Sequence, residues 1–226
     1  MLAKNRIALY GGTFDPVHAG HLEIARKVAT LFEIEKVLFV PAQQAPHKVG
    51  RCVTAAIHRY AMLALATQND SSLAISTFEL DAPDRRYTVE TIRHFQQQLG
   101  ETTELFFVMG SDSWAEITTW REWERLLTMI NHIVVTRPGS ELSTDHAGAV
   151  RERIIDLRTG NTSLTANAKG IFFTDVVMND VSATNIRQLA SEDRIEELAG
   201  LVPGTVLDYI RKYEIYRNWN EAKFNR

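Results

Sequence analysis

Six short, mainly apolar runs recur along the chain, separated by longer segments with helical periodicity. The runs are 7–10, 36–40, 73–76, 105–109, 133–135 and 171–173. Continuous apolar runs of this length are typical of strands buried on both faces, and strands that alternate with helices pair in parallel through crossover connections. We therefore expect an α/β fold: a three-layer, doubly wound, mainly parallel sheet of about six strands with helices on both faces.

The segments between the runs provide the covering helices. The sequence predicts helices over 22–32, 54–68, 88–100 and 123–129, over the second half of 141–158, and as short closing helices over 182–190, 193–199 and 205–213, with a polar loop over 159–169. The apolar side of the helix over 54–68 is expected to be Ile57, Ala61, Leu63, Leu65 and Ala66. No stretch reads as a linker, so we expect one domain over 1–226, with a C-terminal helical part over about 182–217.

Composition narrows the cellular setting and the partners. The 226 residues include a single cysteine, Cys52, which excludes an intrachain disulfide. No N-terminal apolar segment is long enough for a signal peptide or a membrane span, so we expect a cytoplasmic protein without a membrane partner. The net charge of -3 argues against long nucleic acid as a partner, which leaves small anions. A homo-oligomer remains open.

One stretch, Gly11 to His21, joins the first apolar run to the first helical pattern. Glycines are favoured where a ligand or another backbone comes close, and the start of a helix offers unpaired N–H groups and partial positive charge. His18 and His21 are three residues apart, so they fall on one face of the first helical turn. The stretch therefore predicts an anion site.

Two familiar nucleotide-binding motifs are absent from this stretch. It lacks the Gly-Lys-Ser/Thr of a Walker A loop and the G-x-G-x-x-G of dinucleotide-binding folds. A zinc site would need further ligands beyond His18 and His21, and Cys52 has no partner in a cysteine-rich array, so no protein metal site is predicted. The plainest alternative is that the histidines only cap and pack the helix.

Two runs, about 160 residues apart and in the expected order, carry a resemblance. Gly11-Gly12-Thr13-Phe14-Asp15-Pro16-x-His18-x-Gly20-His21 resembles the H-x-G-H signature of nucleotidyltransferases with a Rossmann-like sheet, and Ser182-x-Thr184-x-Ile186-Arg187 resembles their late S-x-T-x-I-R motif. The similarity extends to Pro46-His47-Lys48, Tyr87-Thr88, Gly110-Ser111-Asp112-Ser113, Thr119-Trp120 and Arg137-Pro138-Gly139. From end to end the chain resembles the bacterial nicotinate-nucleotide adenylyltransferases.

The resemblance implies that ATP and nicotinate mononucleotide react to give nicotinate adenine dinucleotide and pyrophosphate, with Mg²⁺ accompanying ATP. It implies catalytic roles for His18, His21 and Arg187. The phosphate that attacks is largely ionised at neutral pH, so positioning and charge stabilisation matter more than a strong base. The ATP-binding residues implied are Gly11, Gly12, Thr13, Phe14, His18, Gly20, His21, Gly110, Asp112, Ser182, Thr184, Ile186 and Arg187.

The mononucleotide side is implied by the middle of the chain. Trp120 offers a flat face for a pyridine ring, Asp112 can accept bonds from a ribose, and backbone N–H groups at Thr88 and Arg121 would hold the nicotinate carboxylate. The other implied mononucleotide-binding residues are Gly12, Lys48, Tyr87 and Arg137.

Several of these residues admit plainer interpretations. Trp120 could belong to the core, and Asp112 could simply cap a helix. Asp15 is interpreted as a turn residue before Pro16, not as a base. Arg85-Arg86 and Arg121 depart from the family pattern, and solvated surface arginines are the favoured interpretation over attraction for a carboxylate.

Two alternative functions stay open. One is transfer to nicotinamide mononucleotide, or another adenylyl or cytidylyl transfer of the same superfamily, because the phosphate motifs are shared. The other is a nucleotide-sensing module that binds without turnover. Intact His18, His21 and Arg187 argue against a sensor.

Overall fold

A computed structural model describes residues 5–43, 53–82, 86–136, 145–159, 169–175 and 181–217. Its elements run in the order β1 (Asn5–Gly12), α1 (Ala19–Leu31), β2 (Lys36–Pro41), α2 (Ala56–Thr67), β3 (Leu73–Ile75), α3 (Thr88–Leu99), β4 (Thr103–Gly110), α4 (Ser111–Ala115), η1 (Ile117–Thr119), α5 (Trp123–Met129), β5 (Asn131–Val135), η2 (Asp145–Arg153), β6 (Ile154–Asp156), η3 (Leu157–Thr159), β7 (Ile171–Thr174), α6 (Ala183–Ser191), η4 (Ile195–Leu198) and α7 (Gly204–Lys212), where η marks a 3₁₀-helix.

The strands form one seven-stranded sheet in the order β3-β2-β1-β4-β5-β7-β6, and every neighbouring pair is parallel. The chain leaves β1 toward β2 on one side and returns through β4 on the other side, so the strand order reverses between β1 and β4. In sheets of this kind ligands bind outside the carboxyl ends of the strands at this reversal. The expected doubly wound α/β architecture is confirmed.

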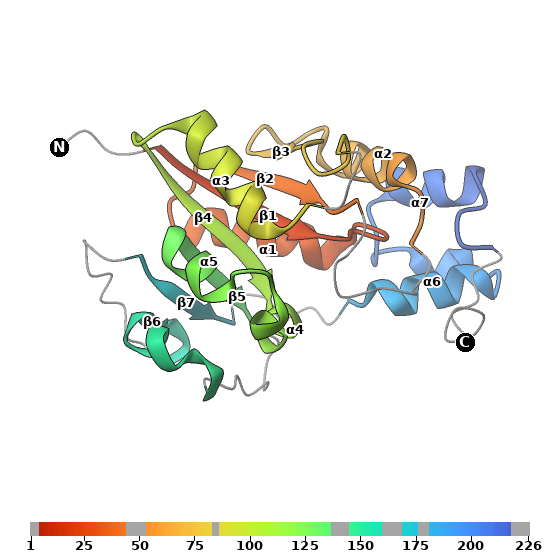
Figure 1. Ribbon diagram of the computed structural model, residues 1–226. Helices are drawn as coiled ribbons and strands as arrows, with labels where there is room; N and C mark the ends of the chain where they lie inside the picture. Colours follow the sequence, from red (N-terminus) through yellow and green to blue (C-terminus); the bar gives the residue numbers. More distant parts are fainter. Residues whose placement is uncertain are drawn as a thin grey trace.

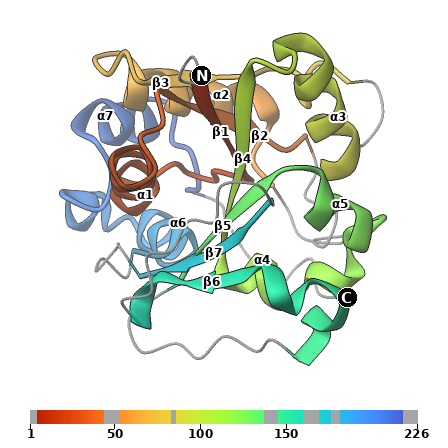
Figure 2. The ribbon, with the colours of Figure 1, turned by 90° about the vertical axis from the view of Figure 1, so that its left-hand side faces the viewer.

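Each face of the sheet packs against its own helices, because side chains alternate across a strand. Ala8 and Tyr10 of β1 face one hydrophobic core, with α1, α2, α6 and α7, while Leu9 faces a second core with α3, α4 and α5. Figure 2 shows the two groups of helices on opposite sides of the sheet when it is viewed along the strands. Both faces of the central strands are therefore apolar, as the continuous runs predict.

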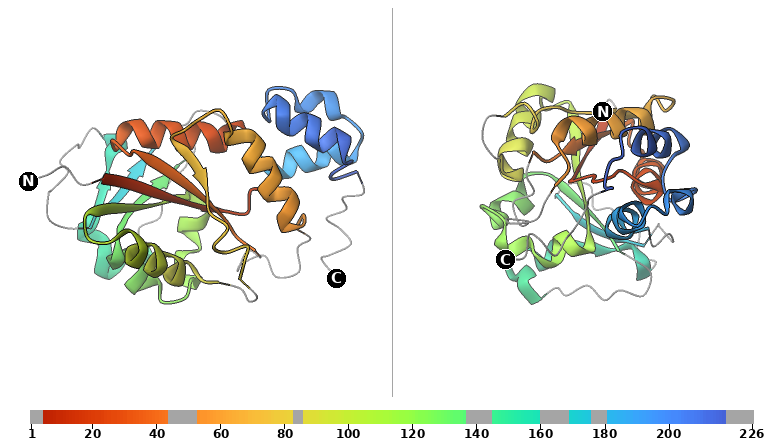
Figure 3. Two further views of the ribbon diagram at one scale, coloured as in Figure 1. Left: turned by 90° about the horizontal axis from the view of Figure 1, so that it is seen from above. Right: turned by 90° about the vertical axis from the view of Figure 1, so that its right-hand side faces the viewer.

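The C-terminal helices lie beyond the carboxyl ends of the strands. Figure 1 shows α6 and α7 to the right of the tip of β1, and the view from above in Figure 3 places them past the end of the sheet beside α1 and α2. A backbone bond ties them there, since the first N–H of α1, on Ala19, donates to the Leu201 carbonyl at 2.8 Å. Residues 181–217 thus return to the edge where β1 ends.

The structure corrects several expectations. The sheet has a seventh strand, β6, within the region expected to be helical; η2 precedes it, and residues 141–144 lie outside the described residues. β6 has three half-buried residues at the edge of the sheet, which is too short for a distinct pattern. Ile57 is 68% exposed, whereas Leu63 is buried as expected, together with Arg59, Met62 and Thr67, which were not expected on the buried side. The helix expected over 193–199 is the 3₁₀-helix η4, and nearly all of the expected 159–169 loop lies outside the described residues.

Candidate active site

The chain turns sharply from β1 into α1 over residues 13–18. β1 ends at Gly12, and His18 is the N-cap of α1 with extended backbone angles. Phe14 has a positive φ of 50°, and the Asp15–Pro16 peptide bond is cis. The strand-to-helix turn predicted for this stretch is confirmed. We call residues 11–21 the histidine loop.

The glycines of this loop make room for other parts of the protein. A Cβ at Gly11 would lie 2.8 Å from the Phe107 ring, and a Cβ at Gly12 would lie 2.8 Å from the Phe14 ring. Real Cβ atoms do not approach other atoms so closely, so no side chain fits at either position without moving a ring. At Gly110, the last residue of β4, no atom of the described residues lies within 4 Å of the equivalent point. Among the described residues, Gly110 therefore has the room that Gly11 and Gly12 lack.

The two histidines stack. Their ring centroids are 3.6 Å apart with planes inclined by 28°, and the backbone N–H of His18 donates to Nδ1 of His21 at 3.3 Å. A nitrogen that accepts this bond carries no hydrogen in the neutral ring, so the proton of neutral His21 belongs on Nε2, which becomes the donor. The His21 ring also packs edge-on against Phe14 at 5.0 Å. Capping and packing therefore orient His21 and leave it a defined donor.

The second motif meets the histidine loop. Ser182 is the N-cap of α6, and the Arg187 guanidinium donates through Nη1 to the Asp15 carbonyl at 2.7 Å and through Nη2 to the Thr184 hydroxyl at 3.1 Å. A Cβ at Gly20 would lie 3.8 Å from Cβ of Val181. The starts of α1 and α6 are thus neighbours, although 172 residues separate Asp15 from Arg187.

Two apolar residues among those predicted to bind ATP have buried side chains, and the polar His18 is also buried, with 7% of the residue exposed. Phe14 is 2% exposed and Ile186 is completely buried, both in the core beneath α1 and α6. Only their backbones can face a ligand. Thr13 and Gly20 belong to the loop itself, and Thr184 is exposed at the first turn of α6.

A second group of residues lies beyond β4 and at the start of α3. Asp112 is exposed in the first turn of α4, whose N-cap is Gly110. Trp120 follows η1, is half-buried, and meets the Phe107 ring edge-on at 6.2 Å. Because Phe107 also fills the space beside Gly11, Trp120 is one ring away from the histidine loop. The position is neither deep core nor open surface.

The Tyr87-Thr88 pair and Arg121 are neighbours. The Arg121 guanidinium lies 4.8 Å from the centre of the Tyr87 ring and 3.7 Å from a carboxylate oxygen of Glu90. Glu90 in turn accepts the Tyr87 N–H at 3.1 Å, at the start of α3. The side chain of Arg121 is therefore engaged at this junction. We call Tyr87, Thr88, Asp112, Trp120 and Arg121 the tryptophan side of the site.

Arg86 differs from the interpretation as a solvated arginine. It is half-buried, and its guanidinium lies 4.2 Å from the centre of the Phe78 ring. The Phe78 ring also stacks on the His94 ring at 3.8 Å and meets the Phe95 ring edge-on at 5.9 Å. Burial raises the pKa of the nearby Glu79 carboxyl, while the Thr91 hydroxyl and the charge of Arg86 oppose that shift. Arg86, the residue before Tyr87, thus packs against Phe78.

Several predicted residues lie outside the described residues, namely Lys48 and Arg137 among the binding residues, and Pro46, His47 and Arg85 among the others. Within the part of the chain that the structure describes, no group of three or more His, Cys, Asp or Glu side chains could hold a metal ion. Among the same residues, no helix is both long and apolar enough to cross a bilayer.

Three buried residues, one in the histidine loop and two packed against it, were not predicted as part of the site. Arg59 is completely buried and donates to the carbonyls of Thr13 at 2.8 Å, Thr54 at 2.9 Å and Gln43 at 3.0 Å. Asp15 is 5% exposed and accepts from Tyr216, which is equally buried. Arg59 carries a signal in the sequence: it stands three and four residues before Met62 and Leu63, at the helical spacing of an apolar face, where a cation needs fixed partners.

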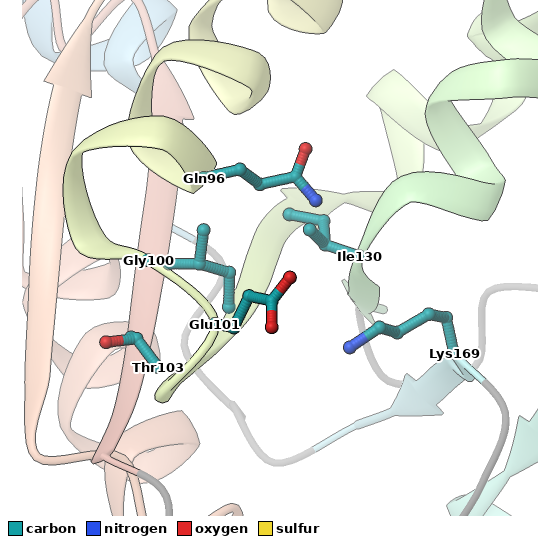
Figure 4. A pocket seen from close by; sticks show the side chains of 7 residues that line it. Gln96, Gly100, Glu101, Thr103, Ile130 and Lys169 are labelled. Carbon is teal, nitrogen blue, oxygen red and sulfur yellow. The ribbon is translucent and has the colours of Figure 1, made fainter.

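A separate hollow of about 300 Å³ lies at the opposite edge of the sheet (Figure 4). It is lined by Gln96, Gly100, Glu101, Thr103, Leu105, Ile130 and Lys169. β4 begins at Thr103 and ends at Gly110, so at roughly 3.3 Å per residue this hollow lies about 23 Å from the carboxyl edge. It is therefore no part of the site at the strand reversal.

Comparison with known proteins agrees with this fold. Residues 9–189 match the family model described as cytidylyltransferase-like, a span that includes both the histidine loop and Arg187. The chain is 38% identical to a probable nicotinate-nucleotide adenylyltransferase of Thermoanaerobacter over 96% of each chain. It is 37% identical to one of Symbiobacterium thermophilum, over 93% of this chain and 95% of the relative.

The fold also matches a solved structure of Plasmodium falciparum nicotinic acid mononucleotide adenylyltransferase complexed with NaAD, with a TM-score of 0.72 and 98% coverage of both chains at 19% identity. The fold and the paired helix starts define a nucleotidyltransferase of the cytidylyltransferase-like class. Within that class, the chain belongs to the nicotinate-nucleotide adenylyltransferase family.

Proposed function

We propose that this protein transfers the adenylyl group of ATP to nicotinate mononucleotide, giving nicotinate adenine dinucleotide and pyrophosphate, a step of NAD biosynthesis. In the reaction a phosphate oxygen of the mononucleotide attacks the α-phosphorus of ATP. The bond from that phosphorus to the bridging oxygen breaks, and pyrophosphate leaves with the electron pair. No covalent enzyme intermediate is needed, since the attacking group is already an anion.

One observation carries the proposal: Arg187 reaches the Asp15 carbonyl at 2.7 Å. This bond joins the two phosphate motifs into one cationic, donor-rich edge where the strand order reverses. Two helix starts, of α1 and α6, meet at this edge, and helix starts favour anions. A triphosphate is the ligand whose length and charge suit two such starts together.

We call the histidine loop and the start of α6, with Ser182, Thr184 and Arg187, the histidine side of the site. Its geometry supports charge stabilisation as the source of catalysis. Nε2–H of His21 is a fixed donor, and His18 stacks on it. The Arg187 guanidinium, which donates to the Asp15 carbonyl and the Thr184 hydroxyl, is a planar cation with several N–H donors. We assign to His18, His21 and Arg187 the stabilisation of negative charge on the α-phosphate and the departing pyrophosphate. Ser182, at the N-cap of α6, is assigned to a phosphate oxygen.

The tryptophan side supports recognition of the mononucleotide. We assign the exposed part of Trp120 to stacking on the pyridine ring, Asp112 to a ribose hydroxyl, and the backbone N–H groups of Thr88 and Arg121 to the nicotinate carboxylate. The contact of Arg121 with Tyr87 brings these two chain segments together, as shared recognition of one carboxylate requires. Lys48 and Arg137 remain expected contributors from outside the described residues.

ATP is expected to arrive as its magnesium complex, so Mg²⁺ belongs to the substrate, and its charge adds to that of the donors around the phosphates. We further propose that the reaction takes place in the cytoplasm and that residues 1–226 act as a single domain.

The test is a product assay with purified protein, MgATP and either nicotinate or nicotinamide mononucleotide. We expect chromatography to show nicotinate adenine dinucleotide and stoichiometric pyrophosphate, with the acid substrate preferred. A clear preference for the amide would replace the named substrate by the alternative one. If no pyrophosphate were released with either mononucleotide, the proposed reaction would be overturned.

A further inference from the structure

Asp15 is a buried residue of the histidine loop whose carboxylate bonds to two distant parts of the chain. Its carboxylate accepts the backbone N–H of Thr54 on one oxygen at 3.0 Å and the hydroxyl of Tyr216 on the other at 2.7 Å. These partners are 39 and 201 residues away in the chain. With 5% of the residue exposed, water cannot easily replace either bond.

The same residue orients Arg187. The Asp15 carbonyl accepts Nη1 of Arg187 at 2.7 Å, so the carboxylate and the carbonyl that directs the guanidinium belong to one residue. A shift of the Asp15 side chain would move that carbonyl with it. His18, the N-cap of α1, follows three residues later. Whatever holds Asp15 therefore acts both on the histidine loop and on Arg187 at the start of α6.

Tyr216 is suited to hold it. The residue lies past the end of α7, is 5% exposed, and has a left-handed φ of 76°, which is unfavourable for a residue with a Cβ. Burial raises the pKa of its hydroxyl well above the usual value, and the charge of Asp15 raises it further. The hydroxyl is thus a proton donor at every working pH.

Arg59 supplies the balancing charge. Burial lowers the pKa of its guanidinium, and the charge of Asp15 opposes that shift. Arg59 binds the carbonyl of Thr54, whose N–H donates to Asp15, and the carbonyl of Thr13 within the histidine loop. The buried carboxylate thus has a cation and two donors around it, as buried charges require.

We propose that Tyr216 is a positioning residue for adenylyl transfer: through Asp15, its hydroxyl sets the geometry of the histidine loop and of the Arg187 guanidinium. The inference rests on the proposed function for its kinetic consequence. It makes the segment after α7 a working part of the site, 29 residues beyond Arg187 in the chain.

The central variant is Tyr216→Phe in the full chain, which removes only the hydroxyl. Tyr213→Phe is the matched control, because Tyr213 lies three residues earlier and is 52% exposed. We expect Tyr216→Phe to lower kcat on the order of tenfold, as for the loss of one hydrogen bond to a charged group, with both KM values within about twofold. Tyr213→Phe should retain the wild-type kcat.

A second variant, Asp15→Asn, keeps the shape of the side chain and removes its charge. If Tyr216 acts through Asp15, the double variant should be no slower than Asp15→Asn alone. Independent, multiplying losses would contradict that route. Asp15→Asn also provides the test should Tyr216→Phe fail to fold, since the proposal then requires a lowered kcat in Asp15→Asn itself.

A readout independent of turnover separates positioning from mere stability. The imidazole nitrogen NMR signals of His18 and His21 should shift in Tyr216→Phe and stay in place in Tyr213→Phe. A lowered melting temperature with unchanged histidine signals and unchanged kcat would overturn the proposal. If the wild type were inactive but the histidine signals still shifted in Tyr216→Phe, the proposed function would be contradicted. The effect of Tyr216 on the histidine loop would then remain supported.

Discussion

The two sides of the candidate site are built differently. The histidine side is tied down by distant segments: Arg59 binds the carbonyl of Thr13, Arg187 binds that of Asp15, and Tyr216 binds the Asp15 carboxylate. On the tryptophan side, Asp112 lies exposed in the first turn of the short helix α4, and Trp120 is half-buried. Charge stabilisation needs donors fixed before the reaction, whereas recognition of a ring tolerates adjustment. The difference in construction therefore matches a division between chemistry and binding.

The largest effect is expected from the histidine side. His21→Ala removes the fixed Nε2 donor, and we expect kcat to fall by about 10²- to 10³-fold, the usual cost of losing one transition-state donor. Steady-state kinetics with saturating ATP and mononucleotide measure it. If turnover equalled that of the wild type, His21 would only cap the helix. The proposed division between chemistry on the histidine side and binding on the tryptophan side would then be wrong.

On the tryptophan side, Trp120→Ala should raise KM for nicotinate mononucleotide by about tenfold, the fold-change for one lost base-to-aromatic stack. KM for ATP should stay nearly unchanged. The measurement is a pair of substrate titrations, each with the other substrate saturating. Equal increases in both KM values would assign Trp120 to folding through its contact with Phe107.

Most of the fold could be predicted from the sequence, because both faces of the central strands are apolar and the runs that form β1, β2 and β4 end at glycine or proline. The range predicted for α5 agrees with the observed Trp123–Met129, and α3 begins at Thr88 as expected. β6 escaped prediction because three residues at a sheet edge, between polar segments, carry no periodicity. Ile57 was misplaced because Arg59 takes a position on the buried side of α2, a tertiary preference that local hydrophobicity does not encode.

The site was legible only in part. The histidines and Arg187 stand in recognisable motifs, and the structure brings them together. The junction at Asp15 depends on Tyr216, 201 residues away, and nothing local in the sequence marks that pairing. The interpretation of Asp15 as a turn residue is accurate but incomplete, since its carboxylate also holds the turn in place. The functional roles of all these residues, and the single-domain organisation, stay predictions.

The pH dependence of stability in acid tests the sheet beneath the tryptophan side without involving the proposed catalytic residues. His132 on β5 is completely buried beside Phe107, and burial lowers its pKa from 6.5 to about 3. The unfolded chain takes up this proton below about pH 6.5 while the folded protein does not, so stability falls as the pH drops toward 3.

Between pH 6.5 and 4.5, His132→Leu should therefore lose roughly 2 to 3 kcal/mol less unfolding free energy than the wild type, at about 1.36 kcal/mol per pH unit. Urea unfolding at the two pH values measures the difference. Parallel losses in the two proteins would mean that His132 is protonated or exposed in the folded state.

The smallest effect is expected from Arg121→Ala. Its ion pair with Glu90 spans 3.7 Å between half-exposed side chains, and exposed pairs contribute about 1 kcal/mol or less. If the backbone N–H of Arg121 holds the carboxylate, KM for nicotinate mononucleotide should rise less than about threefold. A tenfold rise, together with lost preference over the amide, would give the side chain a direct part in recognition.

The central claim is that the histidine loop and the start of α6 form one phosphate clamp. A double-mutant cycle on kcat with His21→Ala and Arg187→Ala tests it most directly, since residues that act as a unit are strongly non-additive. We predict that the double variant is little slower than the slower single variant. Losses that multiply, each variant costing its full factor in the presence of the other, would contradict a single clamp.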